Sequence, residues 1–343
     1  MLYVTTRSDN DAYTAHHALT ENRAPDGGFY VPMKMPRFDR EQIESLKKRP
    51  FNQCVADILN LLLGCRLTAF DVDFTVGRSP VRLEALSHRI LLAQCWYNLD
   101  WDYSRMERSL YERLAGEGAP SDWFRIALRI GVLFGFFGKL MRRDIAGVNK
   151  CVDLAVLSGD FSAVMAAWYA RHWGLPIGNI VLCCNDNNNP WELLHHGEMR
   201  TNTVALSTRT PEGDYAVPTD LERFVHGCGG CREVQRFVEN VREGRMYIPS
   251  DLAYEAMQRM TYVSVVGHAR ILSAIPNVYR THGEVFDPYT ALVYSGLLDY
   301  RAGTGESKPA LILSDKGPNA DPEPIAGAMG ITVEELEAIL NLQ

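Results

Sequence analysis

Two short apolar runs separated by one helical segment constrain the fold more than any other feature of the sequence. Residues 154–157 and 180–184 are apolar and short enough to be buried strands, and the residues between them carry apolar side chains at helical spacing. Gly174 and Pro176 mark the end of that helical segment. Because parallel strands need a long crossover, usually a helix, this unit predicts a parallel sheet in an α/β fold.

The turn between the first of these strands and the helix is the first candidate site. Backbone N–H groups at the start of a helix commonly hold an anion. In this chain Asp160 brings its own negative charge to that place, and we expect it to cap the helix N-terminus. A phosphate dianion at close range would be repelled by this carboxylate.

Length and charge narrow the class of protein. With 343 residues, 46% of them hydrophobic, the chain can bury the core of one large domain or two ordinary ones. A formal net charge of −7 without any basic block predicts no nucleic-acid partner. The N-terminus does not resemble a signal peptide, and the longest uncharged apolar run, 130–138, is too short to cross a bilayer. We therefore expect a soluble, cytoplasmic protein without a membrane partner.

The cysteines and histidines do not form a familiar metal motif. Of the eight cysteines, Cys228 and Cys231 are spaced Cys-x-x-Cys, but no second pair completes the four ligands of a structural zinc site. The adjacent histidines 16/17 and 195/196 cannot face one metal from the same side of a helix. We therefore expect no metal, reduced cysteines and structural or surface histidines. The role of the Cys228/Cys231 pair stays open.

Several motifs resemble one known family. Thr6, Arg7 and the run 24–32 (APDGGFYVP) match its opening segment. The central unit adds Ser-Gly-Asp-Phe, Gly-Leu-Pro-Ile, Asn-Asp-Asn-Asn and His-Gly-Glu. Over residues 1–63 and 119–335 the chain resembles the threonine synthases, which are fold type II lyases that depend on pyridoxal phosphate (PLP). The resemblance implies an α/β fold with a central, mainly parallel sheet flanked by helices, like the large domain of that family.

The chain departs from the family where the cofactor should be attached. Family members carry a segment close to Phe-His-Gly-Pro-Thr-Leu-Ala-Phe-Lys-Asp, whose lysine forms the Schiff base with PLP, and then an Ala-Thr-Ser-Gly-Asp-Thr-Gly turn. Neither is found, and no lysine lies between Lys48 and Lys139. In their place we predict a strand over 66–76 and helices over 80–92 and 103–114. We therefore expect three regions: an N-terminal region, 1–63, a divergent insert, 64–120, and a large α/β domain, 121–343. In the insert, the smaller lysine-bearing domain of the family is deleted or replaced by a helical patch.

The resemblance also implies a set of site residues. Arg125, Asn185 and Asn187 are the expected substrate-binding residues. Lys316, just after the last predicted strand, is the one weak candidate for a surrogate catalytic amine, although it lies on the opposite edge of the cofactor ring from the family's lysine. The vestigial cofactor-binding residues are Ser158, Gly159, Asp160, Phe161, Ser162 and Ser314.

Schiff-base catalysis requires an amine with a lowered pKa and a phosphate held by uncharged donors. In the family an asparagine, a serine and an arginine help hold the substrate phosphate, and of these only Arg125 remains in this chain. Since the expected amine, the uncharged phosphate turn and most substrate-phosphate contacts are missing, we predict a pseudoenzyme without PLP-lyase activity and without a cofactor. It would bind a small anion, an amino acid or a protein partner such as a true threonine synthase. The alternative is an active, PLP-dependent threonine synthase or related lyase, which would convert O-phosphohomoserine to threonine in amino-acid biosynthesis with an altered site.

A third hypothesis concerns the strongly apolar helix predicted over 123–143, which contains Phe134, Phe136 and Phe137. A buried core helix is the first interpretation of this segment. If its aromatic side chains were exposed, they would form a partner-binding face, and the chain would be a homo-oligomeric interaction protein.

Overall fold

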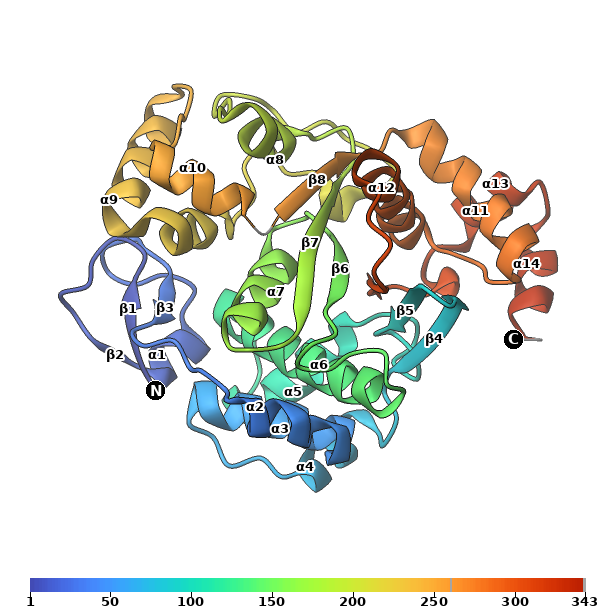
Figure 1. Ribbon diagram of the computed structural model, residues 1–343, viewed down its shortest axis with the longest axis horizontal. Coiled ribbons are helices and arrows are strands. Elements are labelled where there is room, and N and C mark those ends of the chain that lie inside the picture. The colour runs from blue at the N-terminus through green and yellow to red at the C-terminus, as the bar shows by residue number, and fades with distance from the viewer. Residues whose placement is uncertain (260, 342–343) are drawn as a thin grey trace.

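A six-stranded sheet forms the centre of the molecule in the computed structural model, which describes residues 1–259 and 261–341. The strand order is β4-β5-β9-β6-β7-β8, and every neighbouring pair is parallel except β4 and β5 (Figure 1). The predicted α/β fold with a mainly parallel central sheet is therefore confirmed. The strands are β4 Arg82–Ser87, β5 Ile90–Gln94, β6 Val152–Leu157, β7 Ile177–Cys184, β8 Thr261–Val265 and β9 Ala310–Ser314.

Helices cover both faces of this sheet, because successive side chains of each strand point to opposite sides. Leu154 and Val156 of β6 belong to one hydrophobic cluster, together with α3 (Phe51–Leu63), α6 (Asp122–Arg142) and α7 (Ser162–His172). Ala155, between them, belongs to the other cluster. The helices of that second face are α11 His268–His282, α12 Pro288–Thr304, α13 Pro322–Met329 and α14 Val333–Leu340.

Helix α6 is the central helix of the first face. Phe134, Phe136 and Phe137 are at most 1% exposed, so the prediction of a buried core helix is confirmed. The hypothesis of an exposed aromatic face on this helix is wrong, because α3 and α7 pack against it and Phe51 of α3 contacts the ring of Phe136. Three glycines of α6 face α3 and the short 3₁₀ helix Leu46–Lys48, where a Cβ on Gly138 would lie 2.8 Å from the Leu46 carbonyl oxygen.

The N-terminal residues form a small separate sheet with strand order β2-β1-β3. Its strands are β1 Leu2–Thr5, β2 Tyr13–Thr14 and β3 Tyr30–Pro32. The helix α1, Ala15–Thr20, follows β2 directly. It lies beside α9 (Leu221–Glu243), as Figure 1 shows. Glu222 of α9 accepts hydrogen bonds from Thr6 and Arg7, which fastens the small sheet to that helix.

The segment 64–120 differs from its prediction. Residues 66–76 were predicted as a strand, but α4 (Ala69–Val76) is a helix that begins with a capping box formed by Thr68 and Asp71. The predicted helix over 80–92 is also wrong, because β4 and β5 form an antiparallel hairpin there. The predicted helix over 103–114 is confirmed as α5 (Ser104–Ala115). Since β5 pairs with β9, this segment is part of the central sheet.

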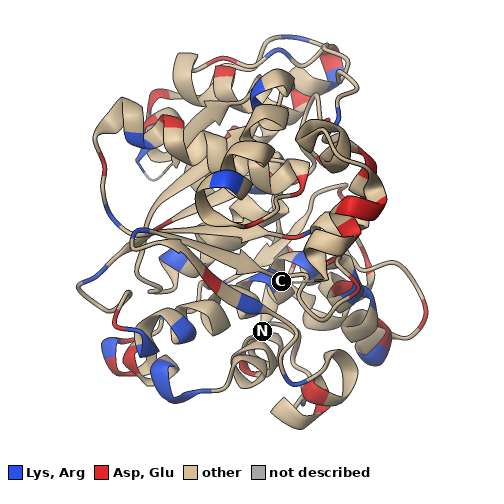
Figure 2. Ribbon diagram, turned by 90° about the vertical axis from the view of Figure 1, so that its right-hand side faces the viewer, with Lys and Arg blue, Asp and Glu red and all other residues tan. Residues whose placement is uncertain are grey.

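The remaining helices are short. They are α2 Arg40–Ser45, α8 Asn189–Trp191, a π-helical turn Glu192–His196, α10 Asp251–Gln258, and the 3₁₀ turns Pro211–Gly213 and Pro318–Ala320. Acidic and basic residues are mixed along the helices on the side drawn in Figure 2. Among the described residues, the helices are too short or too polar for any of them to span a membrane.

Candidate functional site

The predicted site residues meet at the carboxyl edge of the parallel sheet. Residues 158–162 follow β6, residues 185–187 follow β7, and residues 314–316 end or follow β9. In open α/β sheets, ligands bind in the crevice outside the carboxyl ends of the strands. The fold thus brings together the three groups of residues that the sequence singled out.

The turn after β6 is occupied by the carboxylate of Asp160. Its Oδ1 accepts hydrogen bonds from the Ser162 backbone N–H at 2.9 Å and from the Ser162 hydroxyl at 2.6 Å. Asp160 thus bonds the first backbone N–H group of α7, but it is not the N-cap residue that we expected, because that position is Phe161, with a left-handed φ of 73°. Oδ2 of Asp160 accepts a hydrogen bond from Arg125 Nη1 at 2.8 Å. The start of α7 is therefore already paired with an anion of the chain itself.

Arg125 and Asp160 belong to a larger group of buried and half-buried charges, which the sequence pattern reveals only in part. Glu107 of α5 lies 3.5 Å from Arg125 Nε and 3.7 Å from Arg129 Nη2. Arg129 Nη1 also donates to both carboxylate oxygens of Asp315, at 2.7 and 2.8 Å. We call this group of alternating charges the charge chain; its members are Asp160, Arg125, Glu107, Arg129 and Asp315. Three negative and two positive side chains give it a formal charge of −1.

Burial and pairing shift the pKa values of this group in opposite directions. Burial raises the pKa of Glu107, although Arg125 and Arg129 act against the shift. Burial would also raise the pKa of Asp160, but the Arg125 guanidinium and the Ser162 hydrogen bonds outweigh it, so the pKa lies below its ordinary value. Burial would lower the pKa of Arg129, but Asp315 raises it above its ordinary value. The guanidinium carbon of Arg129 also lies 4.2 Å from the centre of the Tyr103 ring.

Ser314, the predicted cofactor-binding residue after β9, is bonded to neighbouring side chains. Its hydroxyl accepts a hydrogen bond from Trp96 Nε1 at 2.9 Å and shares another with the Thr290 hydroxyl at 2.7 Å. Trp96 stacks on Trp101 with ring centres 4.9 Å apart. Gly317 packs against both rings, since a Cβ there would lie 2.5 Å from Trp101. The loop between β5 and α5 thus covers this part of the sheet edge.

Lys316, the weak candidate for a catalytic amine, is held in an ion pair. Its Nζ lies 2.5 Å from Glu212 Oε1. Burial alone would lower the pKa of Lys316, but Glu212 and the Tyr289 hydroxyl raise it above its ordinary value. Lys139 does have a pKa lowered by burial and by two neighbouring arginines, but it lies 14 residues from Arg125 along α6, or about 21 Å. A Schiff-base amine needs the lowered pKa at the site itself.

The space between the ends of β6 and β9 is small. A cavity of about 30 Å³ remains between the ends of β6 and β9 and the helices α7 and α12. Such a volume holds one or two water molecules, whereas ligand pockets usually measure about 300–1,000 Å³. Arg125, Asp160 and Ser314 are bonded to their neighbours, and this cavity is smaller than a cofactor of the size of PLP.

Asn185 and Asn187, the other predicted substrate-binding residues, hold a loop. The side-chain amides of both donate to Asp214 Oδ1, at 2.7 and 3.0 Å, and Asn185 also donates to Thr208 and Thr210. These bonds fix the segment 206–214 against the end of β7. A hollow of about 220 Å³ lies beside it, and its lining includes Asn187, Asn188 and Tyr215. A role of the two asparagines in substrate binding stays a prediction.

Sequence comparisons point to a single family. Residues 2–79 match the family model described as "Threonine synthase N terminus". The threonine synthase of Pseudomonas aeruginosa is 24% identical over 213 residues, which are 60% of this chain and 43% of the relative. The threonine synthase of Methylobacillus glycogenes is 29% identical over 65% of this chain and 46% of the relative. Human "Threonine synthase-like 1" is 23% identical over 56% of this chain and 26% of the relative. The matched part spans less than half the length of each relative.

Solved structures share the fold over nearly the whole chain. A PLP-bound threonine synthase from Brucella melitensis superposes with a TM-score of 0.81 at 16% identity, covering 96% of this chain and 92% of that one. Yeast threonine synthase gives a TM-score of 0.82 at 15% identity and covers 100% and 94%. The N-terminal family model, the homologous sequences and this common fold together support membership of the chain in the threonine synthase family.

Proposed function

We propose that this chain is a pseudoenzyme of the threonine synthase family, without PLP-lyase activity. The observation that carries the proposal is the charge chain. Arg125, which the family resemblance assigns to substrate binding, is bonded instead to Asp160 and Glu107. The groups that would hold an anionic cofactor and substrate are thereby engaged with one another.

Electrostatics at the turn after β6 supports the proposal. A phosphate group placed there would compete with the Asp160 carboxylate for the Ser162 N–H and would lie beside a charge chain with a formal charge of −1. At an effective dielectric constant of 20, two like unit charges 4 Å apart repel by about 4 kcal/mol. This repulsion disfavours a phosphate dianion at a site that attracts one in other proteins.

The positions of the lysines also support the proposal that the chain lacks PLP-lyase activity. Lys34, Lys47, Lys48, Lys150 and Lys308 are exposed, and Lys316 is paired with Glu212. Lys139 has a lowered pKa but lies away from the carboxyl edge of the sheet, and Lys316 lies at that edge with a raised pKa. An amine that forms a Schiff base at neutral pH needs both.

The deciding experiment is an absorption spectrum of the purified protein after incubation with PLP and removal of the excess. We expect no visible band and no turnover of O-phosphohomoserine, while yeast threonine synthase treated in the same way serves as the positive control. A visible band that persists in Lys150→Met but disappears in Lys316→Met would overturn the proposal. Measurable formation of threonine would overturn it too.

The hollow beside Asn188 supports a second function, binding of a small polar ligand such as an amino acid. Its volume of about 220 Å³ and its amide and hydroxyl lining suit a molecule of that size. A thermal shift on adding single amino acids, lost in Asn188→Ala but kept in the exposed control Arg108→Ala, would support this role. If no amino acid shifts the melting temperature, the partners to test next are a second copy of this chain and an active threonine synthase. Light scattering of the chain alone and of the mixture would measure their association.

A further inference from the structure

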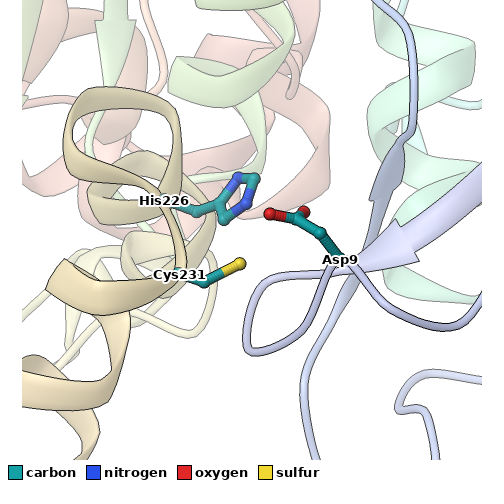
Figure 3. A group of neighbouring side chains, drawn as sticks. All are labelled: Asp9, His226 and Cys231. Atoms are coloured by element: carbon teal, nitrogen blue, oxygen red, sulfur yellow. The ribbon is translucent and has the colours of Figure 1, made fainter.

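A group of three potential metal ligands lies far from the sheet edge, between the small N-terminal sheet and α9. Asp9 belongs to the loop after β1, and His226 and Cys231 belong to α9 (Figure 3). One oxygen of Asp9, one ring nitrogen of His226 and the sulfur of Cys231 all lie within 4.8 Å of one another. In Figure 3 the three side chains point toward one another.

A break in α9 brings the two helical ligands together. Residues five positions apart in an unbroken helix lie about 140° apart around its axis, so His226 and Cys231 would point in different directions. Gly230, directly before Cys231, has a φ of 70° and a ψ of −171°, which interrupts the helix between them. Glycine adopts this backbone conformation without the steric cost that a side chain would add. The kink therefore turns Cys231 toward the same side as His226.

The segment that precedes Asp9 is fastened to α9 two residues before Asp9. Arg7 donates from Nη2 to Glu222 Oε2 at 3.0 Å and from Nε to Glu222 Oε1 at 3.1 Å. Glu222 lies four residues before His226 in α9, one helical turn away. The two segments that supply the ligands are thus fastened to each other beside the group, so that little chain entropy remains to be lost when a metal joins them.

We propose that Asp9, His226 and Cys231 bind a divalent transition metal ion, with Zn²⁺ as the best match. Carboxylate oxygen, imidazole nitrogen and thiolate sulfur are the three ligand types of protein zinc sites. With bonds of about 2.0–2.3 Å, tetrahedral ligand atoms lie about 3.3–3.8 Å apart, so contacts within 4.8 Å close around the ion by small side-chain rotations. The fourth position is left for water or another molecule, because three protein ligands are present.

The group without metal has a simple chemical state. Burial, followed by the nearby Asp9 carboxylate, raises the pKa of the Cys231 thiol to about 11, so the thiol is protonated at neutral pH. A metal ion replaces that proton, and binding therefore releases a proton and weakens in acid. Cys228 is not part of the group, which is why a search for paired Cys-x-x-Cys motifs does not find this site.

The test is a titration of the metal-free protein with Co²⁺, which reports its ligands through its absorption. The exposed Cys151 is replaced by serine throughout, so that it does not bind cobalt on its own. We expect one Co²⁺ per chain, a near-ultraviolet sulfur-to-cobalt band and visible bands of the strength typical of four ligands. Loss of an outer partner of a metal ligand already costs about 10–100-fold in affinity, so Asp9→Asn, His226→Gln and Cys231→Ser should each weaken binding by at least about 100-fold.

Matched controls lie next to each ligand. Asp11→Asn removes an exposed carboxylate two residues from Asp9, and Cys228→Ser removes the other thiol of the pair, so both variants should bind Co²⁺ as the parent does. Circular dichroism confirms that each variant folds, and Asp9 lies on an exposed loop where its replacement does not disturb the core. Absence of stoichiometric binding overturns the proposal. Loss of the sulfur band in Cys228→Ser, or unchanged affinity in both Asp9→Asn and His226→Gln, also overturns it.

Discussion

Arg129 lies between two carboxylates of different elements, Glu107 on α5 and Asp315 after β9, and its side chain is only 6% exposed. Replacing it with leucine would leave both carboxylates without their shared cation. Breaking a buried ion pair on one side costs about 3–5 kcal/mol, because a buried charge remains unpaired. We expect Arg129→Leu to lower the free energy of unfolding in urea by about that amount. Arg108→Leu, at an exposed position of α5, should stay within about 0.5 kcal/mol of the parent, and equal effects of the two variants would contradict a stabilising role for the charge chain.

Asp160 gives the charge chain a pH dependence. The pKa of its carboxyl is lower in the folded protein than the ordinary 3.8, so its contribution to stability is present above pH 3.8 and is lost as the pH falls through the folded value. Asp160→Asn has no such group. We expect the parent to be more stable than the variant at pH 7, with the difference shrinking below about pH 4 in urea titrations at several pH values. A difference that grows on acidification would show that the carboxyl is not stabilised in its charged form.

The sequence reveals only part of the charge chain, for a physical reason. Asp160 stands at a recognisable strand-to-helix turn, and the family resemblance points to Arg125. Glu107 comes from a helix whose charged residues suggest a solvent-facing surface, and Arg129 meets Asp315 across 186 residues of sequence. Pairs of this kind are set by how elements pack, and no local pattern predicts them.

The close contact between α6 and its neighbours gives a test at the scale of an element. Alanine is favoured over glycine inside a helix by about 1 kcal/mol, so propensity alone predicts that Gly138→Ala stabilises the protein. A Cβ at Gly138 would, however, lie 2.8 Å from the backbone oxygen of Leu46. We expect Gly138→Ala to be destabilising by about 1–3 kcal/mol. Gly327→Ala in α13, where a Cβ meets nothing within 4 Å, should be stabilising by about 0.5–1 kcal/mol, and thermal unfolding of both variants checks the two signs.

Elements with one strong local signal were predicted well, and ambiguous ones were not. The apolar runs at 154–157 and 180–184 lie inside β6 and β7, because a strand buried on both faces is apolar throughout. The segment 66–76 alternates like a strand, but the Thr68/Asp71 capping box starts a helix there. The hairpin at 82–94 depends on pairing of β5 with β9, more than 200 residues later in the chain. Pairing with β9 determines the structure of this segment, and a short stretch of sequence around residues 82–94 does not contain β9.

At the scale of the whole molecule, the three regions proposed from the sequence share one hydrophobic core. Val55 from region 1–63, Leu110 from region 64–120 and Leu133 from region 121–343 belong to the same buried cluster. The 64–120 region also contributes two strands to the central sheet. A boundary at residue 63 or 120 therefore separates stretches of sequence that pack as one unit, and the match to the N-terminal family model likewise continues to residue 79.

A shared core predicts cooperative unfolding. If the regions were independent domains, Trp96 and Trp101 in the second region and the four tryptophans of the third region would change their fluorescence at different urea concentrations, and the fluorescence curve would show two steps. Because Trp96 donates to Ser314 and β5 pairs with β9, the second region cannot unfold without disrupting the sheet. We expect urea curves followed by tryptophan fluorescence and by far-ultraviolet circular dichroism to coincide, with one midpoint. Removal of residues 1–63 would uncover the face of α6 that α3 buries, so the fragment 64–343 should lose this single transition. Two separated midpoints in the full chain, or a cooperative transition in the fragment, would mean that the regions fold independently in spite of their common core.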